Sequence, residues 1–159
     1  MLAWLENSGF SEWVKASWGA PALLSVHVVG MALVIAVVAI VHLRLLGVFD
    51  GISYASLGRL FPALWAGLVL ELVSGAAMWA TKAAQYTVDV AFLVKTVLVV
   101  AAFALALILD RAVRRDANSW AAGTAAPRRL ELVVPSLLLW CAVIVFGRLT
   151  AYLGALPVS

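Results

Sequence analysis

The sequence predicts an all-α, polytopic membrane protein that folds as an up-and-down bundle of four transmembrane helices. Of its 159 residues, 65% are hydrophobic and 12% are charged, whereas soluble domains are about half apolar and about a quarter charged. Four apolar stretches, roughly 21–46, 60–81, 90–110 and 133–156, can each cross a hydrocarbon core of about 30 Å at about 1.5 Å per residue. None alternates with the period of two of a barrel strand, so we expect helices in a single membrane domain, 1–159.

The first nineteen residues are predicted to form an interfacial segment, 1–19. The opening MLAWLENSGFSEWVKASW does not resemble a signal peptide. It begins without the positive charge that a signal peptide carries, and it contains two acidic residues, Glu6 and Glu12. Its aromatic side chains are of the kind that lie at the headgroup level: Trp4, Phe10, Trp13 and Trp18. Four more tryptophans near span ends are expected to complete the aromatic belts: Trp65, Trp79, Trp120 and Trp140.

Basic residues predict the orientation of the chain. One side of the predicted bundle carries most of the arginines: Arg44, Arg59, Arg111, Arg114, Arg115, Arg128 and Arg129. The other side has only Lys15 and Lys82 outside the spans. The positive-inside bias therefore predicts that both termini lie outside a bacterial inner membrane, with a cytoplasmic loop at 116–127. Cys141 is alone in the fourth span, which excludes a disulfide framework and a cysteine metal site.

Several polar residues lie inside the predicted spans. Glu71 lies near the centre of the second span, and one residue of each span lies about 8–10 Å toward the outer face: His27, Met78, Lys95 and Arg148. A helical stripe runs along the second span: Gly67, Glu71, Ser74, Gly75 and Met78. In the fourth span Arg148 and Tyr152 repeat at i, i+4. We expect these stripes to face the interior of the bundle.

Charges at this depth should pair. An ionised side chain at a helix centre costs about 2.5–3.5 kcal/mol on insertion scales. Glu71 can offset only one of Lys95 and Arg148, which predicts a buried charge pair and a surplus cation that attracts an anionic ligand. Alternatively, Lys95 extends to the outer interface.

The motifs resemble a known family. HVVGMALVIAVVAIVHLRLLG, AFLVKTVLV and LWCAVIVFGRLTAYLG, together with the Trp-containing start, resemble the DUF6644 type of uncharacterised bacterial four-helix membrane proteins. The chain is more distantly similar to the CopD and cytochrome b561-like membrane domains. The likeness covers nearly the whole chain and implies a polar site that includes His27, Lys95 and Arg148. The chain departs from the family pattern at His42, where an acidic residue is usual, and at Asp110, where a histidine is common.

The only two histidines, His27 and His42, lie fifteen positions apart in the first span. On a helix they differ by about 60° in direction and about 22 Å in height, so one haem cannot bridge them. Two stacked haems b could use them as iron ligands. Within one chain, Met78 or Lys95 would be the second ligand at the outer level. A two-fold dimer would instead pair each histidine with its symmetry mate and leave Lys95 and Arg148 for the propionates of the outer haem. Alternatively, each histidine bonds a neighbouring helix, or His42 meets headgroups.

Three functional hypotheses follow. The first is a b-type cytochrome-like protein that binds haem, with His27 as the best ligand, and that passes electrons between quinone and a partner. The second is a membrane protein that handles a small anion or a proton in an outward-facing cavity lined by Glu71, Lys95, His27 and Arg148. The third is a non-catalytic assembly subunit that uses the small stripe Gly147, Ala151 and Gly154. The residues contain no nucleophile with an adjacent base, phosphate loop or metalloprotease motif, and the basic residues indicate topology rather than nucleic-acid binding; whether the protein is an enzyme stays open.

Overall fold

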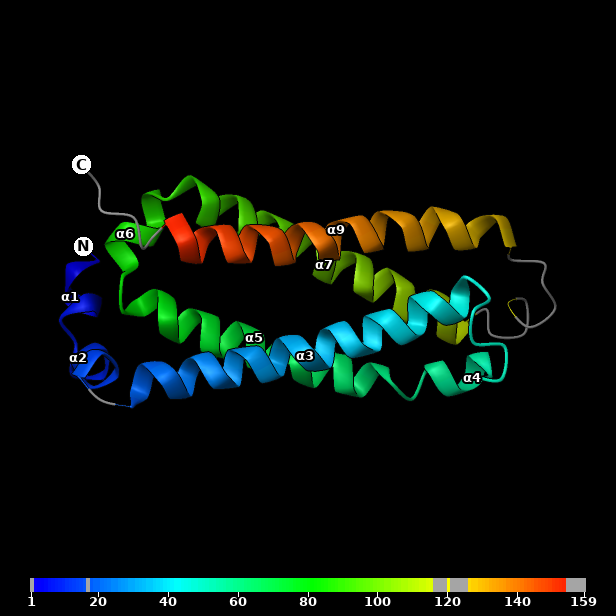
Figure 1. Cartoon of the computed structure of the whole chain (residues 1–159), viewed down its shortest axis with the longest axis horizontal. Coiled ribbons are helices and arrows are strands. Elements are labelled where there is room, and N and C mark those ends of the chain that lie inside the picture. The colour runs from blue at the N-terminus through cyan, green and yellow to red at the C-terminus, as the bar shows by residue number, and fades with distance from the viewer. Residues whose placement is uncertain (1, 17, 116–119, 121–125, 154–159) are drawn as a thin grey trace. The chain divides into compact units, whose positions relative to one another are not determined.

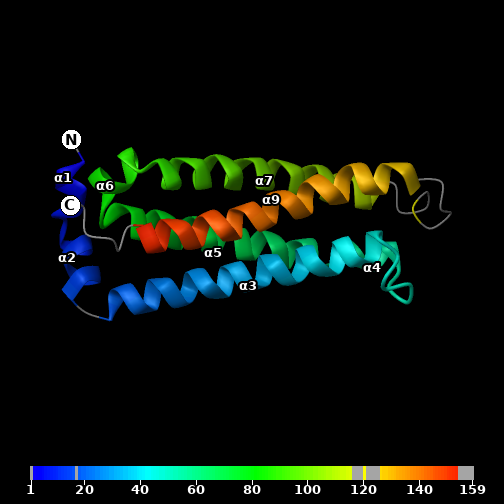
Figure 2. The same cartoon turned by 45° about the horizontal axis from the view of Figure 1, so that its top comes forward.

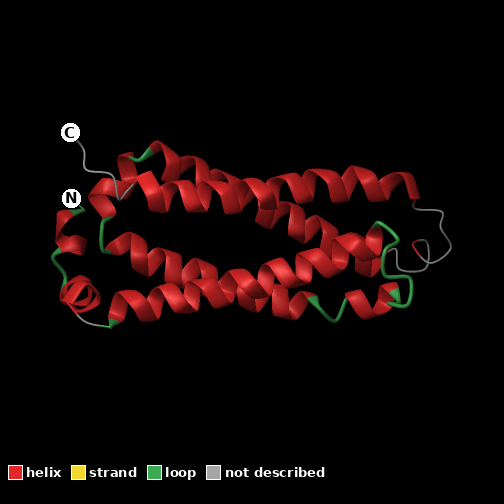
Figure 3. Ribbon diagram, viewed as in Figure 1, coloured by secondary structure: helices red, strands yellow, loops and turns green. Residues whose placement is uncertain are grey.

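The computed structural model describes residues 2–16, 18–115, 120 and 126–153, without the side chains of 126–129 and 150–153. All regular structure in this part is helical, which confirms the all-α class (Figure 3). The helices are α1 (Ala3–Glu6), α2 (Gly9–Ala16), α3 (Gly19–Leu45), α4 (Tyr54–Leu57), α5 (Phe61–Ala80), α6 (Ala83–Val88), α7 (Val90–Arg115) and α9 (Ala126–Leu153).

Four helical segments have the length and hydropathy of membrane spans, which confirms a multi-pass membrane protein. They are Gly19–Leu45, Tyr54–Ala80, Val90–Arg115 and Leu130–Leu149. Two boundaries differ from the prediction: α7 continues to Arg115 rather than ending near 110, and α9 begins at Ala126 rather than near 133. The predicted loop 116–127 falls largely outside the described residues, and its last two residues begin α9.

The chain divides into two compact units that alternate along the sequence. The first comprises Met1–Ala39 and Phe61–Asp89, and the second comprises Ile40–Leu60 and Val90–Ser159. In the first unit α3 lies beside α5 (Figures 1 and 2). In the second unit α7 packs along α9, and α4 contacts α7.

The contact between α3 and α5 uses the small and polar side of α5. Large apolar residues on the other side are exposed: Val69 by 59%, Leu72 by 72% and Val73 by 62%. Gly67 and Ser74 are buried. This distribution suits a membrane helix, because lipid solvates the large apolar side chains while small residues let the helix backbones approach closely.

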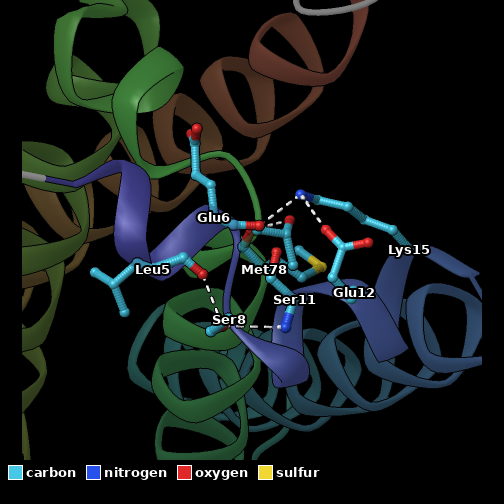
Figure 4. A network of polar contacts seen from close by, with 8 residues as sticks. Leu5, Glu6, Ser8, Ser11, Glu12, Lys15 and Met78 are labelled. Atoms are coloured by element: carbon cyan, nitrogen blue, oxygen red, sulfur yellow. Dashed lines mark hydrogen bonds and ion pairs between the residues drawn. The ribbon is translucent and has the colours of Figure 1, made fainter.

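The N-terminal segment, residues 2–16, folds as a small amphipathic unit of two short helices, α1 and α2, which we call the N-terminal platform. Its aromatic residues are exposed, namely Trp4, Phe10, Trp13 and Trp18, as an interfacial segment requires. Figure 4 shows its polar contacts, in which Lys15 Nζ donates to the Glu6 carbonyl oxygen at 2.7 Å and Ser8 Oγ donates to the Leu5 carbonyl oxygen at 2.7 Å. Glu6 Oε1 accepts the Ala84 N–H at 2.8 Å, so this carboxylate caps the first turn of α6 and ties α1 to it.

The C-terminal end of α3 is closed by Gly47, whose φ of +88° is readily adopted only by glycine. The Val48 N–H donates to the Leu43 carbonyl oxygen at 2.9 Å, and the Gly47 N–H donates to the Arg44 carbonyl oxygen at 3.0 Å. These bonds satisfy carbonyl groups that a helix end would otherwise leave unpaired. The chain can therefore turn sharply toward α4.

The second unit buries an aromatic cluster where the sequence predicts an aromatic belt. The Arg44 guanidinium lies 4.2 Å from the centre of the Tyr54 ring, and Tyr54 lies 6.3 Å from Trp120 between ring centroids. Trp120 is fully buried and donates its indole N–H to the Ala112 carbonyl oxygen at 3.3 Å. Trp140 is also buried. The prediction that these two tryptophans face headgroups is therefore wrong, because helix packing covers their rings.

Candidate functional site in the α3–α5 pair

Three polar side chains meet between α3 and α5 in the first unit. His27 Nε2 lies 3.1 Å from Glu71 Oε2, and His27 Nδ1 lies 2.9 Å from Ser74 Oγ. The His27 side chain is 12% exposed and that of Glu71 is 24% exposed. We call His27 and Glu71 the imidazole–carboxyl pair. The arrangement satisfies both ring nitrogens of a histidine inside an apolar helix.

Helical spacing explains why both groups on α5 reach one imidazole. Glu71 and Ser74 are three residues apart and therefore lie on the same face of α5. Gly75 also faces the ring, because a Cβ built at Gly75 would lie 3.5 Å from His27 Cε1. A Cβ at Gly75 would therefore be in ordinary van der Waals contact with the imidazole.

Two glycines set the distance between the helices beside the pair. A Cβ on Gly30 would lie 2.9 Å from the Gly67 carbonyl oxygen, and a Cβ on Gly67 would lie 2.9 Å from the Gly30 carbonyl oxygen. Gly30 follows His27 by one helical turn, and Gly67 precedes Glu71 by one turn. The close crossing therefore brings the imidazole and the carboxyl group into hydrogen-bond range.

Met78 lies on the same helix, one turn beyond Ser74. The Met78 carbonyl oxygen accepts the Thr81 hydroxyl at 2.7 Å. Ser11 is fully buried. Met78 therefore belongs to the first unit, near the C-terminal end of α5.

The predicted cationic residues belong to the second unit. Lys95 is partly buried on α7, and its Nζ would lie 3.8 Å from a Cβ on Gly147 of α9. Arg148 is exposed on α9. Glu71 contacts His27, and the pairing of Glu71 with Lys95 or Arg148 stays a prediction. The Tyr152 side chain lies outside the described residues.

His42 is nearly fully buried, with 1% of its surface exposed. The alternative that this histidine meets headgroups is therefore wrong, because its side chain is enclosed.

The small stripe of the fourth span was predicted to comprise Gly147, Ala151 and Gly154. The Lys95 side chain lies next to Gly147, so this position of the stripe faces a side chain of the same chain. The other two stripe residues, Ala151 and Gly154, have side chains or backbones outside the described part.

The haem hypothesis can be compared with the surroundings of His27. An axial histidine ligand presents one ring nitrogen to iron and uses the other for a hydrogen bond. In this geometry both nitrogens of His27 contact α5, whose backbone is in close contact with α3 one turn away. The site as described does not fit axial ligation by His27 unless the ring leaves α5. Among the described residues, no group of three or more His, Cys, Asp or Glu side chains could hold a metal ion.

The sequence-based interpretation missed Gly30 and the direct contact of His27 with Glu71. A signal was present: Gly30 lies one turn from His27, as Gly67 does from Glu71. Small residues flanking polar ones on two spans are typical of a close helix crossing with a hydrogen bond beside it.

No protein-family model matches the chain, and no curated protein or solved structure matches it.

Proposed function

We propose that this membrane protein binds a proton at the imidazole–carboxyl pair and passes it through the bilayer. The observation that carries the proposal is the 3.1 Å contact between His27 Nε2 and Glu71 Oε2 inside two membrane-length helices. Imidazole and carboxyl groups are the side chains that most often exchange protons in proteins. Ionisable residues within spans mark proton relays and ion pathways more often than they serve packing alone.

A purely structural role for the pair is less well supported. Helix association in membranes needs only small residues and uncharged hydroxyl or amide groups. Here Gly30 and Gly67 already provide the close approach. Placing a carboxyl group in the same contact adds the cost of desolvating it. A group that is costly to bury and adds little to packing is best explained by its chemistry.

The proposal includes a location and an orientation. The predicted excess of arginine on one side favours a bacterial inner membrane with both termini outside. In that orientation His27 lies in the outer half of the bilayer and Glu71 closer to its centre. The proton would therefore enter the pair from the outer side, next to the N-terminal platform.

A liposome experiment tests the proposal. Purified protein is reconstituted into liposomes that contain a pH-sensitive dye, and a potassium gradient with valinomycin provides the driving force. We expect the internal pH of the liposomes to fall or rise according to the sign of the potential. This pH change should be lost in Glu71→Gln. The control is Glu131→Gln, the same substitution at an exposed carboxylate of α9, which should conduct like the parent. Equal flux in the parent and Glu71→Gln would overturn the proposal.

A further inference from the structure

Ser74 makes two contacts that together constrain the imidazole–carboxyl pair. Its Oγ lies 2.5 Å from the Leu70 carbonyl oxygen and 2.9 Å from His27 Nδ1. A second carbonyl oxygen, that of Glu71, lies 3.4 Å away. Ser74 is buried, with 1% of its surface exposed, so water does not replace these partners.

The hydrogen bond to the Leu70 carbonyl oxygen assigns the hydroxyl proton of Ser74. A carbonyl oxygen can only accept, so a hydroxyl that is bonded to it must donate. The Ser74 hydroxyl therefore donates to the Leu70 carbonyl oxygen. A hydroxyl has one proton, so Ser74 Oγ must accept the hydrogen bond from His27. His27 Nδ1 then carries a proton.

We infer that Ser74 is a positioning residue that holds the His27 imidazole as its Nδ1–H form and directs Nε2 to Glu71. This inference rests on the proposed function for its consequence, but its geometry stands by itself. With Nδ1–H held by Ser74, the contact between Nε2 and Oε2 needs one proton. That proton is either on Glu71, as a carboxylic acid that donates to neutral Nε2, or on Nε2, as an imidazolium that donates to the carboxylate.

The exchange step is then a transfer of one proton along one contact. The Oε2–H bond of Glu71 breaks while the Nε2–H bond of His27 forms, and the bonding pair of the O–H bond stays on the carboxylate. Nδ1–H remains bonded to Ser74 throughout. If the shared proton leaves, two acceptors face each other at 3.1 Å and repel. Proton release therefore weakens the α3–α5 contact at the pair.

Nitrogen NMR of the imidazole tests the inference directly. The chain has two histidines, so the signals missing from a His27→Gln sample identify the His27 ring. We expect a proton on Nδ1 of His27 in the parent. In Ser74→Ala we expect a mixture that includes the Nε2–H tautomer, and Ser74→Thr should restore the parent spectrum, because threonine keeps a hydroxyl that bonds its own helix.

A matched control is available on α3. Ser25 also donates to a carbonyl oxygen of its own helix, that of Pro21 at 2.8 Å, but it is exposed. Ser25→Ala should leave the His27 spectrum unchanged, whereas a merely structural effect of losing a helix hydroxyl would appear in both variants.

The outcomes separate the two proposals. A neutral Nε2–H ring in the parent, or an unchanged ring in Ser74→Ala, overturns the role of Ser74 whatever the liposomes show. The expected tautomer in a protein that does not conduct protons supports the role of Ser74 and overturns proton conduction. When the parent conducts, we expect Ser74→Ala to lower the flux at least tenfold and Ser74→Thr to recover it.

Discussion

Gly30 and Gly67 are in direct backbone contact: a Cβ on either glycine would lie 2.9 Å from the carbonyl oxygen of the other. Such a distance is shorter than any normal van der Waals contact between these atoms, so no other residue fits at this crossing without a shift of α3 against α5. The imidazole–carboxyl pair lies one turn from this contact, and its geometry depends on it.

The first prediction concerns this crossing. Gly67→Ala should destabilise the protein by about 1–3 kcal/mol, because a methyl group is forced into a close-packed contact. Gly75→Ala on the same helix is the control, since its Cβ would meet His27 Cε1 at an ordinary 3.5 Å. Thermal unfolding in detergent measures both. Equal stabilities of the two variants would show that the helices are further apart than described.

The second prediction identifies the partner of Glu71. Double-mutant cycles combine Glu71→Leu with His27→Leu, with Lys95→Met and with Arg148→Met. We expect the largest coupling with His27, about 0.5–3 kcal/mol in size, as for residues in contact. Unfolding in detergent provides the free energies. A larger coupling with Lys95 or Arg148 would restore the pairing predicted from depth in the membrane.

The third prediction concerns haem. A dithionite-reduced spectrum of protein expressed with ample haem tests the cytochrome hypothesis. Both nitrogens of His27 contact α5, so His27 should not ligate iron. We therefore expect that no low-spin α-band of the parent depends on His27, which His27→Ala tests. An α-band lost in His27→Ala and retained in His42→Ala would show that the ring turns away from Ser74 and ligates iron.

The fourth prediction concerns the contact between Arg44 and the Tyr54 ring. Tyr54→Leu should be less stable than Tyr54→Phe by about 0.5–2 kcal/mol, because only phenylalanine keeps an aromatic face below the guanidinium at 4.2 Å. Comparing the two variants removes the effect of the lost hydroxyl. In an Arg44→Met background the difference between them should shrink; if it does not, packing rather than the cation accounts for it.

The fifth prediction concerns orientation. In a Cys141→Ser background, single cysteines replace exposed Asn7 and exposed Gly51. An impermeant maleimide should label position 7 in intact cells and position 51 only after permeabilisation, as the positive-inside bias predicts. Labelling of position 51 from outside would reverse the orientation and place His27 in the inner half of the bilayer.

The sequence was sufficient to predict the all-α class and the four spans. Hydropathy and helical spacing are local properties, and a backbone in lipid must satisfy its own hydrogen bonds within a helix or a closed barrel. The stripe of Gly67, Glu71 and Ser74 was predicted in the same way, because residues three and four apart share a helix face. The boundaries of α7 and α9 were less accurate, since helix ends depend on capping and on contacts beyond the apolar segment.

The contact of Glu71 with His27 was found only in the tertiary structure. The sequence predicts similar depths for His27, Lys95 and Arg148, so it cannot single out His27. The choice depends on which helix faces α5 and how closely, and that is set by the contact of Gly30 with Gly67. The burial of His42 and Trp120 was likewise invisible in the sequence, because both lie near span ends where an interfacial position was equally expected. The length of a span and the set of residues that share one helix face depend on residues close together in the sequence. Hydrogen-bond partners between helices depend instead on where the helices cross, and a crossing brings together residues that are far apart in the sequence.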